Sequence, residues 1–587
     1  MLNQLIHNGI LIPEPPEYRG LVIRVRGQES RLNPKQEEMA LAWVKKLGTP
    51  YVEDPVFERN FFSDFSDTLA VQPILAAAEV DFSAVIAVVE EERQAREKMS
   101  PEEKKELAAW RKAKREELKE TYGHAMADGQ RIELANYIVE PSGIFMGRGK
   151  HPRRGKWKEG ASQSDITLNL SPDAPKPAGE WKEIVWQPES LWVAKWQDKL
   201  TGKLKYVWLH DSAPIKQERE AQKFDKAIEL AGQIEAVRRH IEENMRHEDF
   251  KRRKIATACY LIDALCLRVG DEKDEEEADT VGATTLRPEH VKLHADGTAE
   301  FRFLGKDSVL WHKKLALPAL VQERMKELHQ HARPSHVDKK LRKKGKSTAA
   351  GDKPQLFPDI SSRDVNAFLA EKMAGLSAKV FRTYHASTVV QKSLDESGVV
   401  KPDPEYKKWE ATVRANLQAA ILCNHTKKAP ANWDQRKQTF RQREETLQHQ
   451  IKTVEEKHKG EAEKLSRFRA EMKEKRAKAK NRALKNKVKT AYEKKINTVQ
   501  SNLAKLALRE EKLRSALGKL KAQIALASKN RTWNLGTSQK SYIDPRIFYH
   551  WGRQVEYDVL GKYYSTTLRR KFMWVQGGVN QDDESEQ

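Results

Sequence analysis

Tyr542 is the first residue in this sequence whose surroundings suggest chemistry. It lies in GTSQKSYIDPR (536–546), after a predicted Gly-Thr-Ser turn and three residues before a proline. A tyrosine acts as a nucleophile when other groups activate its hydroxyl, although most buried tyrosines are simply anchors with one polar end. His425, in AAILCNHTKKAP, lies where a helix is expected to end before Pro430, and histidine is often structural there. Neither residue identifies a site by itself.

Three cations in other motifs have properties that suit phosphate chemistry. FRTYHAS places Arg382 and His385 three residues apart on one face of a predicted helix. A guanidinium offers planar paired donors to phosphate and keeps its charge, although a plain polar helix face is the alternative interpretation. Lys306 lies at the tip of a predicted β-hairpin, AEFRFLGKDSVLWHKKL, next to Asp307, where an ammonium could enter a minor groove or donate a proton. Arg268 precedes the acidic run DEKDEEEAD, so ion pairing with that run is its alternative role.

Several other kinds of site are disfavoured. The sequence has no P-loop, no GxGxxG and no nucleophile-elbow GxSxG, so neither ATP nor a dinucleotide cofactor is expected. The acidic run at 271–279 follows no EF-hand pattern, and no CxxC or paired Cys/His spacing occurs, so no metal is expected. Cys259, Cys266 and Cys423 are interpreted as reduced packing residues of an intracellular protein.

The charge of the chain favours a polyanionic partner. Its 587 residues include 107 lysines and arginines against 85 acids, which gives a net charge of +22. Such a surplus points first to nucleic acid and second to an anionic membrane surface, but no apolar run approaches the ~20 residues of a membrane span and no secretory signal begins the sequence. The loop IFMGRGKHPRRGKWK (144–158) could contact phosphates through Arg148, Lys150 and Arg153, or be a solvated basic turn.

The elements that must position these residues change in character along the chain. Residues 1–215 mix strand-like pieces such as KYVWLH with a helical insert at 90–118, and residues 219–430 are mainly helical. Within the second region, KRRKIATACYLIDALCLRVGDE predicts an amphipathic helix that Gly270 stops. Its apolar stripe is Ile255, Cys259, Ile262, Cys266 and Val269.

Residues 431–530 have the composition of a long basic coiled coil. They hold 28 lysines and arginines against 12 acids and no proline, and apolar residues recur at spacings of three and four. The pattern lapses at RAKAKNRALKNKVK (476–489), the predicted reversal point between two antiparallel helices. Such a hairpin returns the chain to its origin, so Tyr542 is expected beside residues near 425.

In their order and joint occurrence these motifs resemble the eukaryotic-type DNA topoisomerases of class IB. The resemblance rests on YLIDALCLRVGDEKDEEEADTVGATTLRPEHVKL, FRFLGKDS, AKVFRTYHAS, AAILCNH and LGTSQKSYIDPRI, with RLNPKQEEMA, GIFMGRGKHPRRGKWK and LTGKLKYVWL before them. It covers residues from about 10 to 575, without the long charged N-terminal extension of the nuclear enzymes. A eukaryotic, bacterial or viral source is therefore left open.

The resemblance implies a multidomain α+β fold of the tyrosine recombinase and topoisomerase IB kind. It comprises a mixed α/β N-terminal DNA-binding cap (1–218), a mainly helical catalytic core with a β-hairpin (219–430), an antiparallel coiled-coil linker (431–529) and a small helical C-terminal domain (530–587).

The resemblance also implies a set of site residues. The catalytic residues by this likeness are Tyr542 as nucleophile, Arg268, Lys306, Arg382 and His425; the DNA-binding residues are Arg148, Lys150, Arg153 and Asp307. Arg148 would contact the minor groove, and Asp307 would lie close to the cleaved base step. His385 stands where the family usually has asparagine and is not counted as catalytic. Ser541 replaces the asparagine before the tyrosine, in the pocket of the inhibitor camptothecin, so drug sensitivity is open.

The implied activity is relaxation of positive and negative supercoils through a 3′-phosphotyrosyl intermediate, controlled rotation and religation, without ATP or an obligatory metal. The implied state is a monomer that clamps duplex DNA, without cofactor or membrane, inside the cell with chromosomal DNA (nucleus in a eukaryote, cytoplasm or nucleoid in a bacterium). Two other functions remain open from the sequence. One is a tyrosine site-specific recombinase, and the other is a non-enzymatic, basic DNA-architectural protein.

Overall fold

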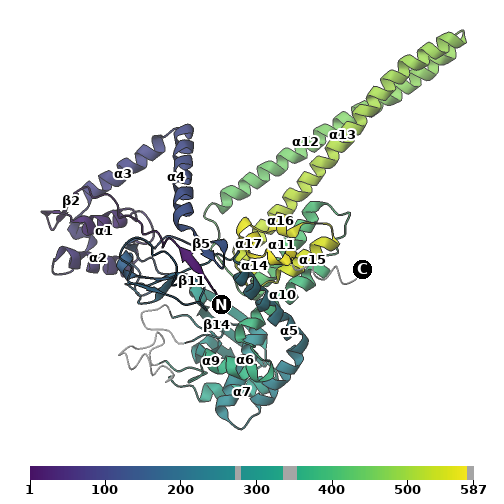
Figure 1. The fold of residues 1–587 in the computed structure, drawn as a ribbon. Helices are drawn as coiled ribbons and strands as arrows, with labels where there is room; N and C mark the ends of the chain where they lie inside the picture. The colour runs from purple at the N-terminus through teal and green to yellow at the C-terminus, as the bar shows by residue number, and fades with distance from the viewer. Residues whose placement is uncertain (272–278, 335–352, 578–587) are drawn as a thin grey trace. The chain divides into compact units, whose positions relative to one another are not determined.

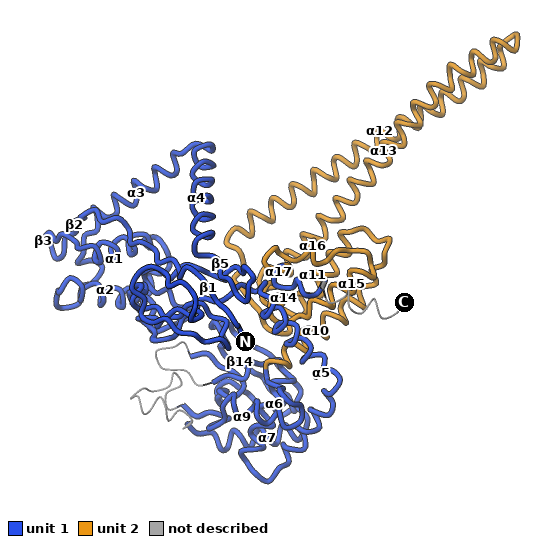
Figure 2. The backbone as a smooth tube through the Cα atoms, in the orientation of Figure 1, with its two compact units in different colours: residues 1–378, 570–587 blue, residues 379–569 orange. Residues whose placement is uncertain are grey.

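The computed structural model describes residues 1–271, 279–334 and 353–577, and these form two compact units (Figure 2). The first unit comprises Met1–Ala378 with the segment that begins at Arg570, and the second is Lys379–Arg569. The fold is mixed α/β, with several small sheets and a predominance of helix. Most of the acidic run considered as a partner of Arg268 lies outside the described residues.

The N-terminal part of the first unit contains four small sheets. Their strand orders are β1-β5-β6, β3-β2-β4, β7-β8 and β10-β9-β11-β12, and only β10 and β9 pair in parallel. The elements are β1 (Leu5–His7), β2 (Val22–Val25), β3 (Gln28–Arg31), α1 (Pro34–Val44), α2 (Pro55–Leu69), β4 (Val80–Asp81), α3 (Ser83–Lys98), α4 (Pro101–Tyr122), β5 (His124–Ala127), β6 (Gln130–Glu133), β7 (Gly143–Ile144), β8 (Trp157–Lys158), β9 (Ile166–Asn169), β10 (Glu183–Val185), β11 (Trp192–Gln197) and β12 (Leu204–Trp208).

Two hydrophobic cores hold this part together. One packs apolar residues of β9, β11 and β12 against β1, β5 and β6. The other is rich in aromatic rings, because α2 contributes four phenylalanines and three of them pack on Trp43 of α1, whose ring lies 4.5 Å from that of Phe61. The predicted helical insert is confirmed as two helices, α3 and α4. Ser100 separates them because its side chain accepts from the Glu103 amide while Glu103 caps the Ser100 amide in return.

The remainder of the first unit is helical around one three-stranded antiparallel sheet, β13-β14-β15. The elements are α5 (Pro214–Met245), α6 (Phe250–Leu265), β13 (Val291–Leu293), β14 (Thr298–Gly305), β15 (Val309–Ala316), α7 (Ala319–Gln330), α9 (Ser362–Lys372) and α18 (Trp574–Gly577). The predicted β-hairpin around Lys306 is therefore confirmed.

The second unit combines a small helical bundle with two very long helices. Its elements are α10 (Ala378–Asp395, which begins at the unit boundary), α11 (Glu405–Leu422), α12 (Trp433–Lys478), α13 (Arg482–Asn530), α14 (Leu535–Ser541), α15 (Pro545–Gln554), α16 (Val559–Tyr563) and α17 (Thr566–Lys571, which ends beyond the boundary).

Helices α12 and α13 lie side by side (Figure 1). Tyr492 of α13 donates to Glu471 of α12, and Asn502 of α13 donates to Glu461 of α12. As the residue number rises along α13, the number of its partner in α12 falls. This pairing is antiparallel. The turn between the helices falls at residues 479–481, inside the predicted reversal segment. The antiparallel coiled coil predicted from the apolar spacing is confirmed.

Candidate functional site

Tyr542 follows immediately after helix α14. The Asn534 side chain accepts from the Thr537 amide and starts this helix, so the Gly-Thr-Ser segment is helical and its predicted turn is wrong. An N-cap asparagine outweighs the turn preference of one glycine. The Tyr542 amide donates to the Ser538 carbonyl at 2.9 Å, and the tyrosine is only 8% exposed. The phenol is thus fixed by the last turn of a short helix.

His425 reaches the same place from the end of α11. Asn424 adopts a left-handed conformation with φ 54°, which turns the chain out of the helix. The Lys427 amide then donates to the Thr532 carbonyl at 2.8 Å, and the Asn534 amide donates to the His425 carbonyl at 2.6 Å. The chain that returns from α13 therefore lies directly against the chain that left α11, and the expectation that Tyr542 lies beside residues near 425 is confirmed.

Arg382, His425 and Tyr542 form a buried cluster in the second unit. The imidazole of His425 stacks on the Tyr542 ring with centroids 5.2 Å apart, and the Arg382 guanidinium carbon lies 4.9 Å from that ring's centroid. Arg382, on α10, is 2% exposed and donates from one nitrogen to the Cys423 carbonyl at 2.8 Å and to His425 Nε2 at 3.2 Å. Two donor side chains are therefore held against one tyrosine, an arrangement suited to an anionic group at its hydroxyl.

Two serines that sequence reasoning missed support this cluster. His425 Nδ1 lies 2.7 Å from Oγ of Ser538, in α14. Ser387, on α10, accepts from the Asp544 amide at 3.0 Å and donates to the Tyr542 carbonyl at 3.4 Å, which ties the backbone around Tyr542 to the helix of Arg382. Both serines lie within motifs that the sequence analysis quoted, GTSQKSY and FRTYHAS, but hydroxyls follow no spacing rule that would single them out.

Lys306 occupies the tip of the β14–β15 hairpin in the first unit. Gly305 faces Val309 across the pair, and Lys306–Ser308 forms a short 3-10 turn, η5, between the strands. Asp307 in that turn has a left-handed φ of 64°, a conformation that aspartate tolerates better than most residues. Lys306 is exposed at this tip, so its ammonium is presented to solvent by a rigid two-stranded support.

The basic loop at 144–158 packs against the same tip. The Arg148 guanidinium makes an ion pair with the Asp307 carboxylate. Gly149 has a φ of 59°, and a Cβ atom there would lie 2.5 Å from Cβ of Ser308, so only glycine allows this approach. The structure thus brings Arg148 together with Asp307, neighbours in space but 159 residues apart in sequence.

The other two predicted DNA-binding residues lie further along the loop. Lys150 is exposed, and the half-buried Arg153 donates to the Leu200 carbonyl. Arg153 also lines a cavity of about 560 Å³ with Lys156 and Lys199, although carboxylates share this lining. The surface beside this end of the loop is therefore mixed in charge rather than purely basic.

Arg268 lies beyond the end of its helix, contrary to the prediction that Gly270 stops that helix. Helix α6 ends at Leu265, because Cys266 takes a left-handed conformation with φ 53°. The apolar spacing continues through Cys266, which is buried after the helix has ended, so periodicity could not locate the end. All three cysteines are reduced and buried, as predicted, and burial raises the pKa of the Cys259 thiol.

Two glycines fix the backbone around Arg268. A Cβ atom on Gly282 would lie 2.5 Å from the Gly270 Cα, and the Ala283 amide donates to the Arg268 carbonyl at 2.9 Å. The two segments therefore touch backbone to backbone. Close contact of this kind sets the position from which the half-buried Arg268 side chain extends.

We expect Gly282→Ala to destabilise the first unit. The new methyl group meets backbone atoms that cannot rotate away, and such overpacking costs about 1–3 kcal/mol. Thermal unfolding followed by scanning fluorimetry should show a lower Tm than the wild type. The matched control is Gly232→Ala in α5, where nothing lies within 4 Å of the new Cβ and the helix gains propensity. An unchanged Tm for Gly282→Ala would contradict the close contact.

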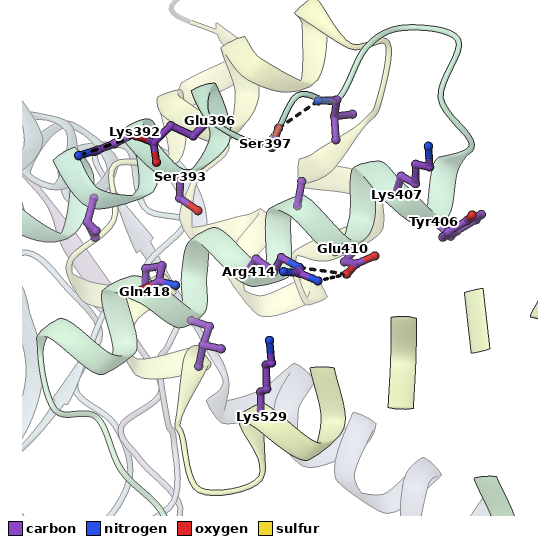
Figure 3. A pocket seen from close by; sticks show the side chains of 14 residues that line it. Lys392, Ser393, Glu396, Ser397, Tyr406, Lys407, Glu410, Arg414, Gln418 and Lys529 are labelled. Carbon is purple, nitrogen blue, oxygen red and sulfur yellow. Dashed lines mark hydrogen bonds and ion pairs between the residues drawn. The ribbon is translucent and has the colours of Figure 1, made fainter. Parts of the chain in front are cut away.

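A larger cavity in the second unit does not coincide with the tyrosine cluster. It has a volume of about 830 Å³ and is lined by residues of α10, α11 and the end of α13, and none of Arg382, His425 and Tyr542 is among them (Figure 3). One cation of the lining, Arg414, pairs with Glu410 on its own helix. Because the lining holds none of the clustered residues, it gives no reason to place the chemistry there.

No group of three or more histidine, cysteine or acidic side chains in the described ranges is arranged to hold a metal ion. Likewise, no helix in the described part of the chain has the length and apolar character needed to cross a membrane.

Comparison with known proteins gives matches along the length of the chain. The family model "Eukaryotic DNA topoisomerase I, catalytic core" matches residues 212–458, "Eukaryotic DNA topoisomerase I, DNA binding fragment" residues 2–209 and "C-terminal topoisomerase domain" residues 514–585. DNA topoisomerase 1 of Homo sapiens is 32% identical over 97% of this chain and 70% of its own length, and that of Rattus norvegicus is 32% identical over 99% and 71%. The mitochondrial DNA topoisomerase I of Pan troglodytes is 32% identical over 99% of this chain and 91% of its own length.

Proposed function

The chain belongs to the eukaryotic DNA topoisomerase I family and is a type IB DNA topoisomerase, and we propose that Tyr542 is the nucleophile with which it opens a DNA strand. The observation that carries this assignment is the stacking of Tyr542 on His425 and beneath Arg382, three residues from separate parts of the chain. The proposed fold is that of the tyrosine recombinases and type IB topoisomerases.

In the proposed reaction, the Tyr542 hydroxyl loses its proton to solvent, its oxygen attacks the phosphorus of a phosphodiester, and the bond to the 5′-oxygen breaks. The products are a 3′-phosphotyrosyl enzyme and a free 5′-hydroxyl. Because the ester bond energy is kept in the covalent link, the 5′-hydroxyl can reverse the reaction without ATP. Arg382 and His425, together with Arg268 of the first unit, donate to the non-bridging oxygens as their negative charge grows in the transition state.

Lys306 is the proposed general acid. Its exposed ammonium at the rigid hairpin tip protonates the departing 5′-oxygen during cleavage and takes the proton back during religation. Asp307 and Arg148 form an ion pair next to Lys306. Asp307 is proposed to lie close to the cleaved base step, and Arg148 is proposed to contact the minor groove. Lys150 and Arg153 are proposed phosphate contacts. With this set of cationic donors, the reaction has no obligatory need for a metal.

The proposed domain organisation follows these roles. Residues 1–218 form the DNA-binding cap, 219–430 the catalytic core, 431–529 the linker and 530–587 the tyrosine-bearing domain. We propose that one monomer clamps duplex DNA inside the cell, where it acts on the chromosome. The linker carries most of the surplus charge, so it is proposed to lie near the downstream duplex and slow its rotation.

Relaxation of a supercoiled plasmid in EDTA without ATP tests this function. The purified chain should relax positive and negative supercoils to completion, since strand rotation has no preferred direction. Activity should fall steeply as salt rises, because phosphate contacts dominate binding. A recombinase would act only at a particular sequence, and an architectural protein would leave the linking number unchanged after the protein is removed. Either of those results would overturn the proposal.

A further inference from the structure

Ser538 contacts both residues of the stacked pair. Its side chain is fully buried, and its Oγ lies 2.7 Å from Nδ1 of His425. Its carbonyl accepts the amide of Tyr542 at 2.9 Å and that of Ile543 at 3.2 Å. A single residue in the last turn of α14 therefore holds the imidazole with its side chain and the tyrosine with its backbone.

The hydrogen bond at Nε2, the other ring nitrogen of His425, determines which group donates in the contact between Nδ1 and Ser538. Nε2 of His425 lies 3.2 Å from a guanidinium nitrogen of Arg382, and a guanidinium only donates hydrogen bonds. Nε2 must therefore accept, which places the proton of the neutral ring on Nδ1. The Nδ1–H group then donates to Ser538 Oγ, so the geometry assigns both the tautomer and the ring orientation.

We propose that Ser538 is a positioning residue for DNA cleavage, acting through His425. Nδ1 carries its hydrogen in both the neutral and the doubly protonated ring, so Ser538 can accept it throughout the reaction. Nε2 is then the nitrogen directed at the phosphate, and it donates to the non-bridging oxygens once it has taken up a proton and given up the hydrogen bond from Arg382. The proposal rests on the function proposed above for His425. Ser538 touches neither DNA nor the reacting atoms in this role.

Removing only the Ser538 hydroxyl tests the role. Ser538→Ala should cleave a duplex oligonucleotide about 10–100-fold more slowly in single turnover, as is typical when the hydrogen-bond partner of a functional histidine is lost. The Kd for the same duplex should be unchanged. Ser538→Thr, which restores the acceptor, should return the rate to within about threefold of wild type. The matched control is Thr412→Val in α11, which removes another fully buried hydroxyl and should leave the rate unchanged.

A double-mutant cycle separates positioning from general support of the fold. In a His425→Ala background, Ser538→Ala should not lower the cleavage rate further, because the imidazole that Ser538 orients is already gone. An equal loss in both backgrounds, or a Ser538→Ala rate close to wild type, would overturn the proposal. If the alanine variant does not fold, Ser538→Cys, with its weaker acceptor, takes its place in the cycle. Failure of the wild type itself to cleave would instead contradict the proposed function.

Discussion

Tyr542→Phe is expected to lower the rate of plasmid relaxation at least ~10³-fold, because the nucleophilic oxygen is lost while the ring that stacks on His425 remains. The substitution removes one atom from a buried ring, so the variant should fold and bind duplex DNA as the wild type does. The measurement is the rate of plasmid relaxation under enzyme excess in EDTA, paired with a gel-shift measurement of Kd.

The control for this variant is Tyr557→Phe. Tyr557 is another buried tyrosine of the second unit, and burial together with the nearby Glu405 and Asp558 carboxylates raises its pKa to about 12, so it is a poor candidate for a nucleophile at neutral pH. The Tyr557→Phe variant should relax plasmid at the wild-type rate. Relaxation by Tyr542→Phe at a comparable rate would show that the nucleophile is a different residue.

Lys306→Ala is expected to slow cleavage by about 10²–10⁴-fold, the usual contribution of a general acid. The loss should depend on the leaving group. When sulfur replaces the bridging 5′-oxygen of the substrate, the leaving group departs as a stable thiolate that needs no proton. The Lys306→Ala variant should therefore cleave this substrate at nearly the wild-type rate. Arg268→Ala should remain slow on the sulfur substrate, because its proposed contact is with the non-bridging oxygens.

Lys314→Ala provides the control for the hairpin itself. Lys314 lies on β15 and its ammonium is 3.5 Å from the Asp296 carboxylate, away from the tip. Its loss should leave cleavage of both substrates unchanged. If the sulfur substrate fails to rescue Lys306→Ala, the lysine holds the phosphate or the groove rather than donating a proton.

The sequence predicted the elements of this fold where a regular pattern ran long enough. The alternation around Lys306 predicted the β14–β15 hairpin, and the apolar spacing within residues 431–530 predicted the coiled coil with its reversal near residue 480. From the coiled coil alone it followed that Tyr542 lies beside His425, because an antiparallel pair must return the chain to its start. These are local periodicities, and a long run averages out individual exceptions.

The errors and omissions concern single residues whose conformation depends on distant contacts. Cys266 ends α6 by adopting a left-handed conformation that no apolar pattern records. The ion pair of Arg148 with Asp307 depends on how two loops fold onto each other, and the roles of Ser387 and Ser538 on hydroxyl hydrogen bonds. Such contacts have no sequence period, so only the folded backbone reveals them.

The most direct test of the account is the chemical identity of the covalent enzyme–DNA complex. The wild type is trapped on a duplex whose scissile strand carries a label at its 5′ end, and the complex is digested with trypsin and sequenced by mass spectrometry. The account predicts that the label stays with the protein, through a 3′-phosphate on Tyr542 in the peptide SYIDPR (541–546). Attachment to any other residue, or through the 5′ end of the DNA, would contradict it.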